Sequence, residues 1–261
     1  MRIAAVGDLH CTAAAQGTFE PLFAAMGRAA EAIVLAGDLT DYGLPEEAHV
    51  LVREVRAASP TPVLAVLGNH DFESGAPDKV RAILEESGVV VLDGGSHVIG
   101  EVGFAGVKGL GGGFGQRALQ PWGEDVMKRL VHETVAEALK LETALARLRT
   151  PARVAVLHYA PVRETVEGEP MEIFPFLGSS RLEEPLVRYS VTVVVHGHAH
   201  HGQPEGRIRS GAPVYNVCLP LLRAASPEQP FRLIDLGALA PGAAAGEDAI
   251  STAAAEESSR A

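Results

Sequence analysis

Short apolar runs that end in polar residues recur along the chain. Each run is continuous instead of alternating with polar positions, which is typical of strands that are buried on both faces. The pattern predicts five such strands, in RIAAVGD (2–8), AIVLAGD (32–38), PVLAVLGNHD (62–71), RVAVLHYAP (153–161) and VTVVVHGH (191–198).

Helical patterns lie between these runs. Segment 45–59 begins with Pro and two acids, which favours a helix start, and segment 78–87 is followed by Gly88, a favourable helix end. The longest helix is expected over 123–150, where apolar residues recur every three or four positions before Pro151. The alternation of strands and helices predicts an α/β protein, whose ligands gather beyond the carboxyl ends of the strands.

The remaining segments have weaker patterns. Residues 89–107 contain short apolar runs broken by DGGS and IGEVG, which favours a hairpin. Two further strands are expected within 213–236 to complete the fold. Beyond this point Ala, Gly, Glu and Ser dominate, so we expect one domain over 1–237 and a disordered tail over 238–261.

Composition limits the functions that need to be considered. Hydrophobic residues make up 47% of the 261 residues, and a formal net charge of -11 without a basic run disfavours binding to nucleic acid or an anionic membrane. Cys11 and Cys218 are far apart, which argues for a reducing compartment and against a cysteine-built zinc site. The first apolar run is too short for a secretion signal and no stretch is long enough for a membrane span. We therefore expect a cytoplasmic protein.

Each predicted buried strand is followed by side chains that can bind a metal. Residues two apart in an extended chain point to the same side, so Asp8 with His10, and His198 with His200, can each face one centre. Carboxylate, imidazole and amide oxygen together suit Mn, Fe or Zn. The residues at the five strand ends are Asp8, His10, Asp38, Asn69, His70, Asp71, His158, His196, His198 and His200.

Each piece alone has an ordinary structural explanation. A Gly-Asp pair after a strand is often a turn, a lone histidine such as His158 is often a core residue, and Asn69 can cap the next segment. Five pieces in order at five successive strand ends favour a shared metal site over these separate explanations.

The ordered series GDLH, AGDLT, GNHD, LHYAP and GHAH resembles the calcineurin-like metallophosphoesterase superfamily. The resemblance covers residues 3 to about 220, and all five elements of the pattern are intact. It implies a four-layer αββα sandwich, in which two mixed β-sheets stack face to face with helices on both outer sides. It also implies a pair of divalent metal ions, Mn, Fe or Zn, bound at the strand ends.

The resemblance assigns a role to each residue of the pattern. One metal would be held by Asp8, His10 and His200, and the second by Asn69, His158 and His198, with Asp38 bridging both. His70 would lie beside the scissile phosphate without binding metal, and Asp71 would help to orient it. A hydroxide shared by the metals would then attack phosphorus in line, while His70 protonates the leaving oxygen.

Other residues near these motifs are given structural roles. No Ser or Cys stands among the motifs as a nucleophile, and Cys11 is expected to be a small buried neighbour of the site. We interpret His196 as a structural residue at the end of its strand and His201 as solvent-facing. Tyr159 stands where the family often has a second histidine, a departure that removes no ligand but alters the polarity of the pocket.

Two long loops are candidates for substrate selection. The glycine-rich segment 106–125 lacks a P-loop ending, and is either a rim that brings Phe114, Arg117 or Trp122 to the substrate or a tolerated insertion. In segment 166–186, Ser179 and Arg181 either reach a phosphate or brace the following helix.

The favoured function is hydrolysis of a small-molecule phosphate ester, either a monoester or a diester such as a cyclic nucleotide. The alternative is a non-catalytic metal-binding scaffold on the same fold, but such relatives tend to lose ligands or the GNH histidine, and here both are present. A metal-storage or pH-sensing protein would not need Asp8, Asp38 and Asn69 at strand ends. The oligomeric state is left open by the sequence.

Overall fold

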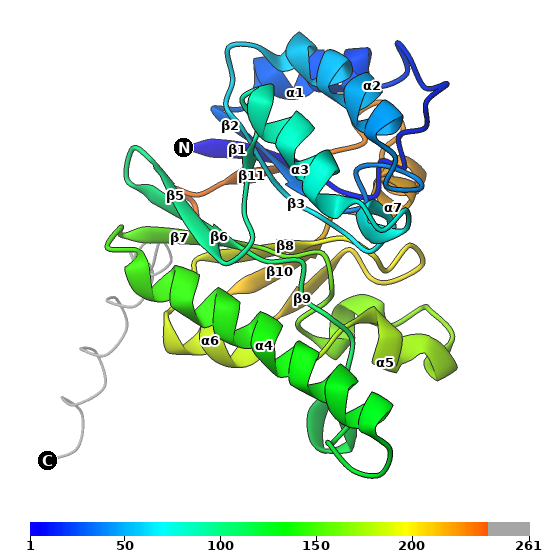
Figure 1. The fold of residues 1–261 in the computed structure, drawn as a ribbon. Coiled ribbons are helices and arrows are strands. Elements are labelled where there is room, and N and C mark those ends of the chain that lie inside the picture. Colours follow the sequence, from blue (N-terminus) through cyan, green and yellow to red (C-terminus); the bar gives the residue numbers. More distant parts are fainter. Residues whose placement is uncertain (240–261) are drawn as a thin grey trace, which may run out of the picture.

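The computed structural model describes residues 1–239, so the predicted disordered tail lies outside the described residues except for positions 238 and 239. Two β-sheets form the centre of the molecule (Figure 1). In the first sheet, β1 to β4 are parallel and the edge strand β11 is antiparallel to β1. Its strand order is β11 (Arg232–Asp235), β1 (Arg2–Val6), β2 (Ala32–Ala36), β3 (Val63–Val66) and β4 (Val90–Val91).

The second sheet has four parallel inner strands, β6, β7, β8 and β10, and an antiparallel strand at each edge. Both sheets are therefore mixed. The strand order is β5 (Gly95–Ile99), β6 (Val102–Gly106), β7 (Ala152–Val156), β8 (Val193–His196), β10 (Pro213–Asn216) and β9 (Glu205–Arg207).

Helices cover the outer face of each sheet (Figure 1). The first sheet is covered by α1 (Glu20–Ala29), α2 (Pro45–Val55) and α3 (Pro77–Glu86), and the second by α4 (Asp125–Arg147) and α6 (Glu183–Arg188). Two short helices, α5 (Phe174–Leu177) and α7 (Leu219–Ala225), lie outside these layers. The predicted fold class, with two mixed sheets flanked by helices, is confirmed.

The continuous apolar runs are explained by burial on both faces. On β7, Val154 and Val156 pack in the core between the two sheets, while Ala155 packs on the other side in the core beneath α4. Val193 and Val195 of β8 likewise face the first sheet. Since neither face meets water, no polar alternation appears in these strands.

The structure adds detail to two predicted segments. The hairpin expected within 89–107 is confirmed, because β5 and β6 pair antiparallel in the second sheet, whereas β4 pairs with β3 in the first sheet. Within 213–236, β10 and β11 join different sheets and α7 lies between them. Pairing partners are set by tertiary packing, which these short segments do not encode locally. Among residues 1–239, no helix has the length and hydropathy needed to cross a bilayer.

Candidate metal centre

The polar residues predicted at the strand ends meet where the parallel strands of both sheets finish. Asp8 and His10 follow β1, Asp38 follows β2 and Asn69 follows β3 in the first sheet. From the second sheet, His158 follows β7, while His198 and His200 follow β8. Residues up to 192 positions apart are thus brought to one edge of the molecule.

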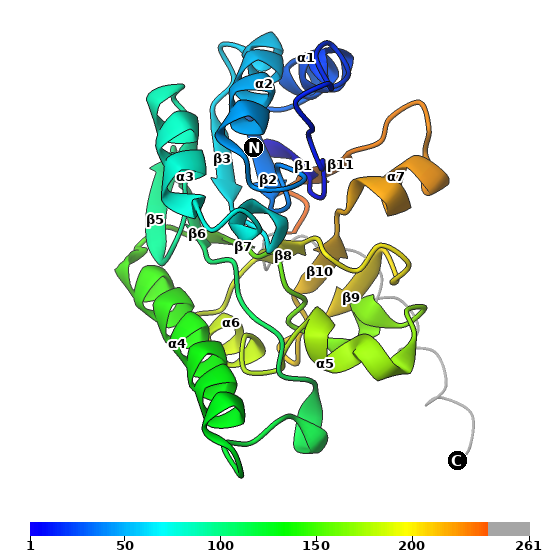
Figure 2. The same ribbon diagram turned by 45° about the vertical axis from the view of Figure 1, so that its right-hand side comes forward.

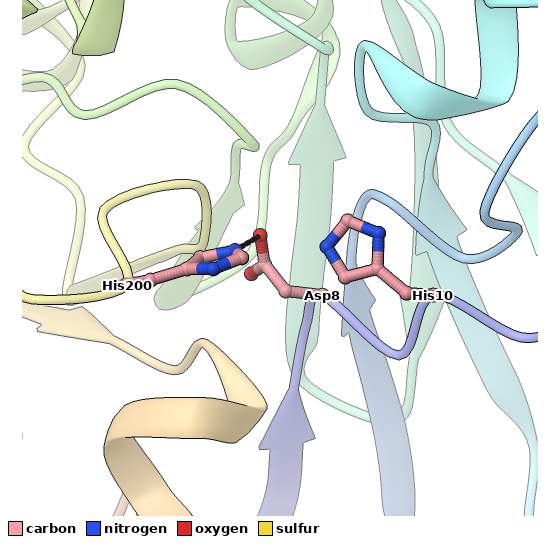
Figure 3. Close-up of side chains that lie close together, drawn as sticks. All are labelled: Asp8, His10 and His200. Carbon is pink, nitrogen blue, oxygen red and sulfur yellow. Dashed lines mark hydrogen bonds and ion pairs between the residues drawn. The ribbon is translucent and has the colours of Figure 1, made fainter.

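The ligand atoms gather into overlapping groups, in each of which the atoms lie within 4.8 Å of one another. Asp8, His10 and His200 form one group, and Figure 3 shows the two imidazoles on either side of the Asp8 carboxylate. Asp38, His158 and His198 form a second group. The structure therefore brings together the two sets that the sequence assigned to separate metals.

Asp38 lies between the two sets. It also forms a group with His10 and His70, and its Oδ2 is 3.9 Å from His10 Nε2 while its Oδ1 is 3.3 Å from His158 Nε2. Burial opposes ionisation of this carboxyl, but attraction by His158 lowers its pKa below the usual value. A buried, ionised carboxylate between two histidine sets has the position expected of a bridging ligand.

Asn69 completes the second set. Its Oδ1 lies 2.9 Å from His158 Nε2. His158 Nδ1 donates to the Ala36 carbonyl at 2.9 Å, so in the neutral ring the lone pair on Nε2 faces the oxygens of Asn69 and Asp38. Three lone-pair atoms around one point need a cation or a proton among them. Burial disfavours charge on His158, yet Asp38 raises its pKa to about 9.

His10 provides a second test of whether a metal fits. Its Nε2 is buried and has no hydrogen-bond partner among residues 1–239, although a buried polar atom without a partner is costly. Burial lowers the pKa of His10 despite two nearby carboxylates, which keeps the imidazole neutral and able to bind a metal. The donor set and this unpartnered nitrogen both fit divalent metal ions.

The backbone is strained at the same positions. Five residues other than glycine have positive φ within 1–239, and four of them are Asp8 (56°), His10 (46°), Asp38 (48°) and His198 (70°). Positive φ is unfavourable for residues with a Cβ and is concentrated at functional sites. The chain therefore turns sharply after β1, β2 and β8, where these side chains lie.

Two glycines allow the strand-end loops to approach the acids. A Cβ on Gly68 would lie 2.1 Å from Asp38 Oδ1, and one on Gly197 would lie 2.2 Å from Asp8 Oδ2. Both distances are far inside van der Waals contact. The Gly in each of the motifs GNHD and GHAH is therefore required by the neighbouring carboxylate.

Hydrogen bonds and burial set the charges of the last two histidines. The bond between His200 Nε2 and Asp8 Oδ1, 3.1 Å long, raises the pKa of His200 (Figure 3). Burial, and then repulsion by His158, lowers the pKa of His198 to about 4. His198 Nε2 donates to the Phe176 carbonyl at 3.1 Å, which leaves the lone pair on Nδ1.

His70 lies at the edge of the cluster. Its backbone N–H donates to Asp38 Oδ1 at 2.8 Å, and its ring packs edge-on against His10 with 4.4 Å between centroids. Ring Nδ1 donates to the Asp41 carbonyl at 2.6 Å. In the neutral ring the lone pair is therefore on His70 Nε2.

Asp71 is hydrogen-bonded to the backbone of two strand-end loops. Its carboxylate is fully buried and accepts bonds from the backbone N–H groups of Gly68, Leu39 and Thr40 and from the Thr40 hydroxyl. It thereby ties the loop after β2 to the loop after β3. The Asp41 carbonyl, and not Asp71, holds the His70 ring.

The other two histidines of the HGHAHH segment (196–201) lie outside the cluster. His196 is fully buried, with Nδ1 donating to the Gly197 carbonyl and Nε2 2.7 Å from the Thr165 hydroxyl. Burial lowers its pKa to about 4, so it stays neutral. His201 is exposed. These positions agree with the structural and solvent-facing roles predicted for them.

The two long loops are joined to each other. Gly112 and Gly113 donate backbone hydrogen bonds to Pro175 and Gly178. Phe114 and Phe174 both pack against a small buried cluster of Ala160, Val166, Leu177 and Ala199, while Trp122 is 56% exposed. Arg117 is also exposed.

In the 166–186 loop, both candidate residues serve the backbone. Ser179 is fully buried and its hydroxyl accepts from the Arg181 N–H. The Arg181 guanidinium donates to the Leu119 carbonyl at 2.9 Å. Ser179 therefore braces the turn before α6, whereas Arg181 ties this loop to the 106–125 loop.

Sequence patterns missed two residues beside the centre. Asp41 Oδ1 lies 3.3 Å from His10 Nδ1, and only its place three residues after Asp38 could have indicated it. Lys108 belongs to the glycine-rich loop and lines a cavity next to Asn69. A single lysine within GVKGLGGG carries no recognisable pattern.

Comparison with known proteins identifies the family. The family model for calcineurin-like phosphoesterases matches residues 1–202, whereas no curated protein matches the chain. The fold is similar to that of phosphopantetheinyl hydrolase from Mycobacterium tuberculosis, with a TM-score of 0.64, 17% identity and coverage of 89% of this chain and 95% of the other.

A second similar structure is purple acid phosphatase PPD1 from yellow lupin, with a TM-score of 0.53 and 13% identity over 83% of this chain and 43% of the other. At these identities the two structures show a shared fold. The match to the family model covers more than half of the chain and includes all of the strand-end residues described above. The chain therefore belongs to the calcineurin-like phosphoesterase family and is a metal-dependent phosphate ester hydrolase.

Proposed function

We propose that the chain uses two divalent metal ions, Mn, Fe or Zn, to hydrolyse a small phosphate monoester or diester, cyclic nucleotides included. The observation that carries the proposal is the position of Asp38. Its buried carboxylate belongs both to the group with His10 and to the group with His158 and His198, so one side chain faces two adjacent ligand sets.

The residues present account for both metals. Asp8, His10 and His200 would hold one ion; Asn69, His158 and His198 would hold the other, with Asp38 between them. Two bound cations supply a water of lowered pKa and neutralise charge on the phosphoryl oxygens.

The protein groups then support an in-line displacement. Water oxygen forms the new bond to phosphorus, the ester P–O bond breaks, and the leaving oxygen takes a proton. His70 gives that proton from Nε2 as an imidazolium, because its Nδ1–H is committed to the Asp41 carbonyl, and the proton lost by the attacking water returns to the ring through solvent. Asp71 keeps the two loops that carry Asp38 and Asn69 in register.

A covalent enzyme intermediate is not part of the proposal. Both cysteines are buried, and burial raises the pKa of each thiol, that of Cys11 to about 12. Neither is a thiolate at neutral pH, so neither is an effective nucleophile. A direct attack by water predicts inversion at phosphorus, which a chiral phosphorothioate ester would reveal.

The proposal is tested by reconstitution with Mn after chelation. Assays on p-nitrophenyl phosphate, bis-p-nitrophenyl phosphate and cyclic AMP are compared with an Asp38→Ala variant. We expect two metals per chain and hydrolysis that the variant lacks. The preferred ester shows whether the enzyme is a diesterase or a monoesterase.

Two results would count against the proposal. Binding of two metals without hydrolysis of any ester would favour the non-catalytic scaffold. A stoichiometry of one metal, unchanged by Asp38→Ala, would remove the bridging role of this carboxylate. Metal content by mass spectrometry and rates measured on the same preparation distinguish these cases.

A further inference from the structure

A cavity of about 500 Å³ adjoins the proposed metal centre on the side of Asn69 and Tyr159. The Tyr159 ring lies 4.4 Å from the His198 ring, centroid to centroid, so the cavity wall continues directly into the second ligand set. From there it extends toward α3 and α4, which lie on the same side of the molecule, one on each outer layer (Figure 2). Its volume is in the range of small-molecule sites.

Most charges that line the cavity neutralise each other. The Arg81 guanidinium is 2.7 Å from Asp93, and Lys140 Nζ is 2.7 Å from Glu137 and 3.3 Å from Asp93. Lys108 is different, because it makes no salt bridge with any residue of the described range 1–239. It is the cavity's one cation without a carboxylate partner in that range.

Lys108 is held in place while two of its three hydrogen-bond donors have no protein acceptor within residues 1–239. Its Nζ lies 5.4 Å from the centroid of the Phe72 ring and 5.1 Å from that of Tyr159, and it donates one hydrogen bond, to the Gly109 carbonyl at 2.8 Å. Aromatic faces attract an ammonium group but accept no conventional hydrogen bond. An ammonium has three donors, so two remain for a ligand.

The charges also divide the cavity into two ends. Asp78 and Glu133 have no salt bridge within residues 1–239, but both are exposed at the outer rim. Lys108 is half-buried at the inner end, near Asn69. An anionic group is therefore favoured only at the end of the cavity that faces the metal centre.

We propose that this cavity receives the organic substituent of the ester, and that Lys108 is a specificity residue that binds an oxyanion on that substituent, close to the scissile phosphate. This inference rests on the proposed function for the position of the phosphoryl group. The oxyanion is a carboxylate or a second phosphate, which present the same acceptor chemistry to an ammonium group.

Binding of phosphonates that cannot be hydrolysed tests the inference. Propylphosphonate, 3-phosphonopropanoate and ethane-1,2-bisphosphonate have similar size and differ in the end group: methyl, carboxylate or phosphonate. Calorimetry on the Mn-loaded protein is expected to give a Kd about tenfold or more lower for the charged ligands. The better of the two charged ligands identifies the oxyanion.

Variants assign this preference to Lys108. Lys108→Gln is expected to remove it while leaving the Kd of propylphosphonate within about twofold, and Lys108→Arg to keep most of it. Lys140→Gln is the matched control, because this lysine lines the same cavity but is paired with Glu137.

The outcomes separate this inference from the proposed function. Equal Kd values for the three phosphonates, or a preference that persists in Lys108→Gln, would overturn the role of Lys108 even if the enzyme hydrolyses esters. A preference that Lys108→Gln abolishes supports that role even if no tested ester is hydrolysed.

Discussion

The Asp8 carboxylate accepts the backbone N–H of His198, at 2.9 Å to Oδ1 and 3.1 Å to Oδ2. This bond joins the end of β1 in the first sheet to the end of β8 in the second. Asp8 therefore holds the backbone of the GHAH loop as well as a proposed metal.

The two roles of Asp8 are separable by substitution. Asp8→Ala leaves a part-buried N–H unpaired and is expected to destabilise the metal-free protein by about 1–3 kcal/mol. Asp8→Asn retains an oxygen acceptor, so it should recover part of that stability without recovering metal binding. Denaturant unfolding in EDTA and metal content after dialysis measure the two effects. Equal stability of the two variants would contradict the role of this hydrogen bond in joining the two sheets.

Asp71 is expected to contribute more to the free energy of unfolding than the exposed acid Glu73. Asp71→Ala would leave four donors from Gly68, Leu39 and Thr40 without an acceptor in a fully buried position. We expect a loss of about 3 kcal/mol or more in the free energy of unfolding. Glu73→Ala, an exposed acid two residues away, is the control and should change stability by less than about 0.5 kcal/mol.

Gly68→Ala tests how tightly the loops are packed around Asp38. The new methyl group would lie 2.1 Å from Asp38 Oδ1, so the carboxylate must move. Metal binding and hydrolysis are expected to be lost together, because Asp38 is shared by both ligand sets. Gly95→Ala provides the comparison, since its Cβ would meet no atom within 4 Å. Normal metal content in Gly68→Ala would show that Asp38 is not held as described.

Metal uptake is expected to release protons near neutral pH. Burial opposes charge on His158, but Asp38 raises its pKa to about 9, so the metal-free site carries this proton at pH 7.5. A metal ion must displace it, and apparent affinity should therefore rise with pH up to about 9. Titration with Mn in a weakly buffered indicator solution should show about one proton fewer released at a pH above 9 than at 7.5.

The same proton affects the metal-free fold. Because the folded pKa of His158 exceeds its ordinary value of 6.5, its contribution to stability is complete below pH 6.5 and is lost as the pH rises through about 9. Unfolding in EDTA across this range should show the loss. His158→Asn should flatten the pH dependence of the free energy of unfolding. An unchanged slope in that variant would show that another group causes the pH dependence.

The ligand candidates were predictable because each follows a buried strand directly in sequence. Asp38 comes two residues after the apolar run of β2, and His158 two residues after that of β7. Parallel strands place their carboxyl ends at one edge of a sheet, so local sequence patterns were enough to predict that these side chains lie together. The order of motifs, GD, GNHD and GHAH, then supplied the resemblance that separated them into two sets.

What the sequence missed depends on contacts between distant elements. The Asp41 carbonyl reaches the His70 ring, and Asp71 accepts from Thr40, only because two loops fold against each other. Lys108 stands out as a ligand-binding candidate only in the folded protein, where two aromatic rings hold its ammonium group and the other cations of the cavity are paired in salt bridges. Likewise, β4 pairs with β3 because of tertiary packing, and a two-residue strand is too short for its sequence to indicate its pairing partner.

The distribution of the proposed ligands over both sheets bears on how the chain matures. A nascent chain that has emerged only as far as β4 contains Asp8, His10, Asp38 and Asn69, but none of the three histidines of the second sheet. Contacts between such distant positions form late in folding, since a long loop must close first. Complete occupation of the proposed metal sites therefore requires synthesis of nearly the whole domain. A chain truncated before β8 would lack His198 and His200, one ligand from each proposed set, so tight metal retention would mark only those molecules in which both sheets have come together.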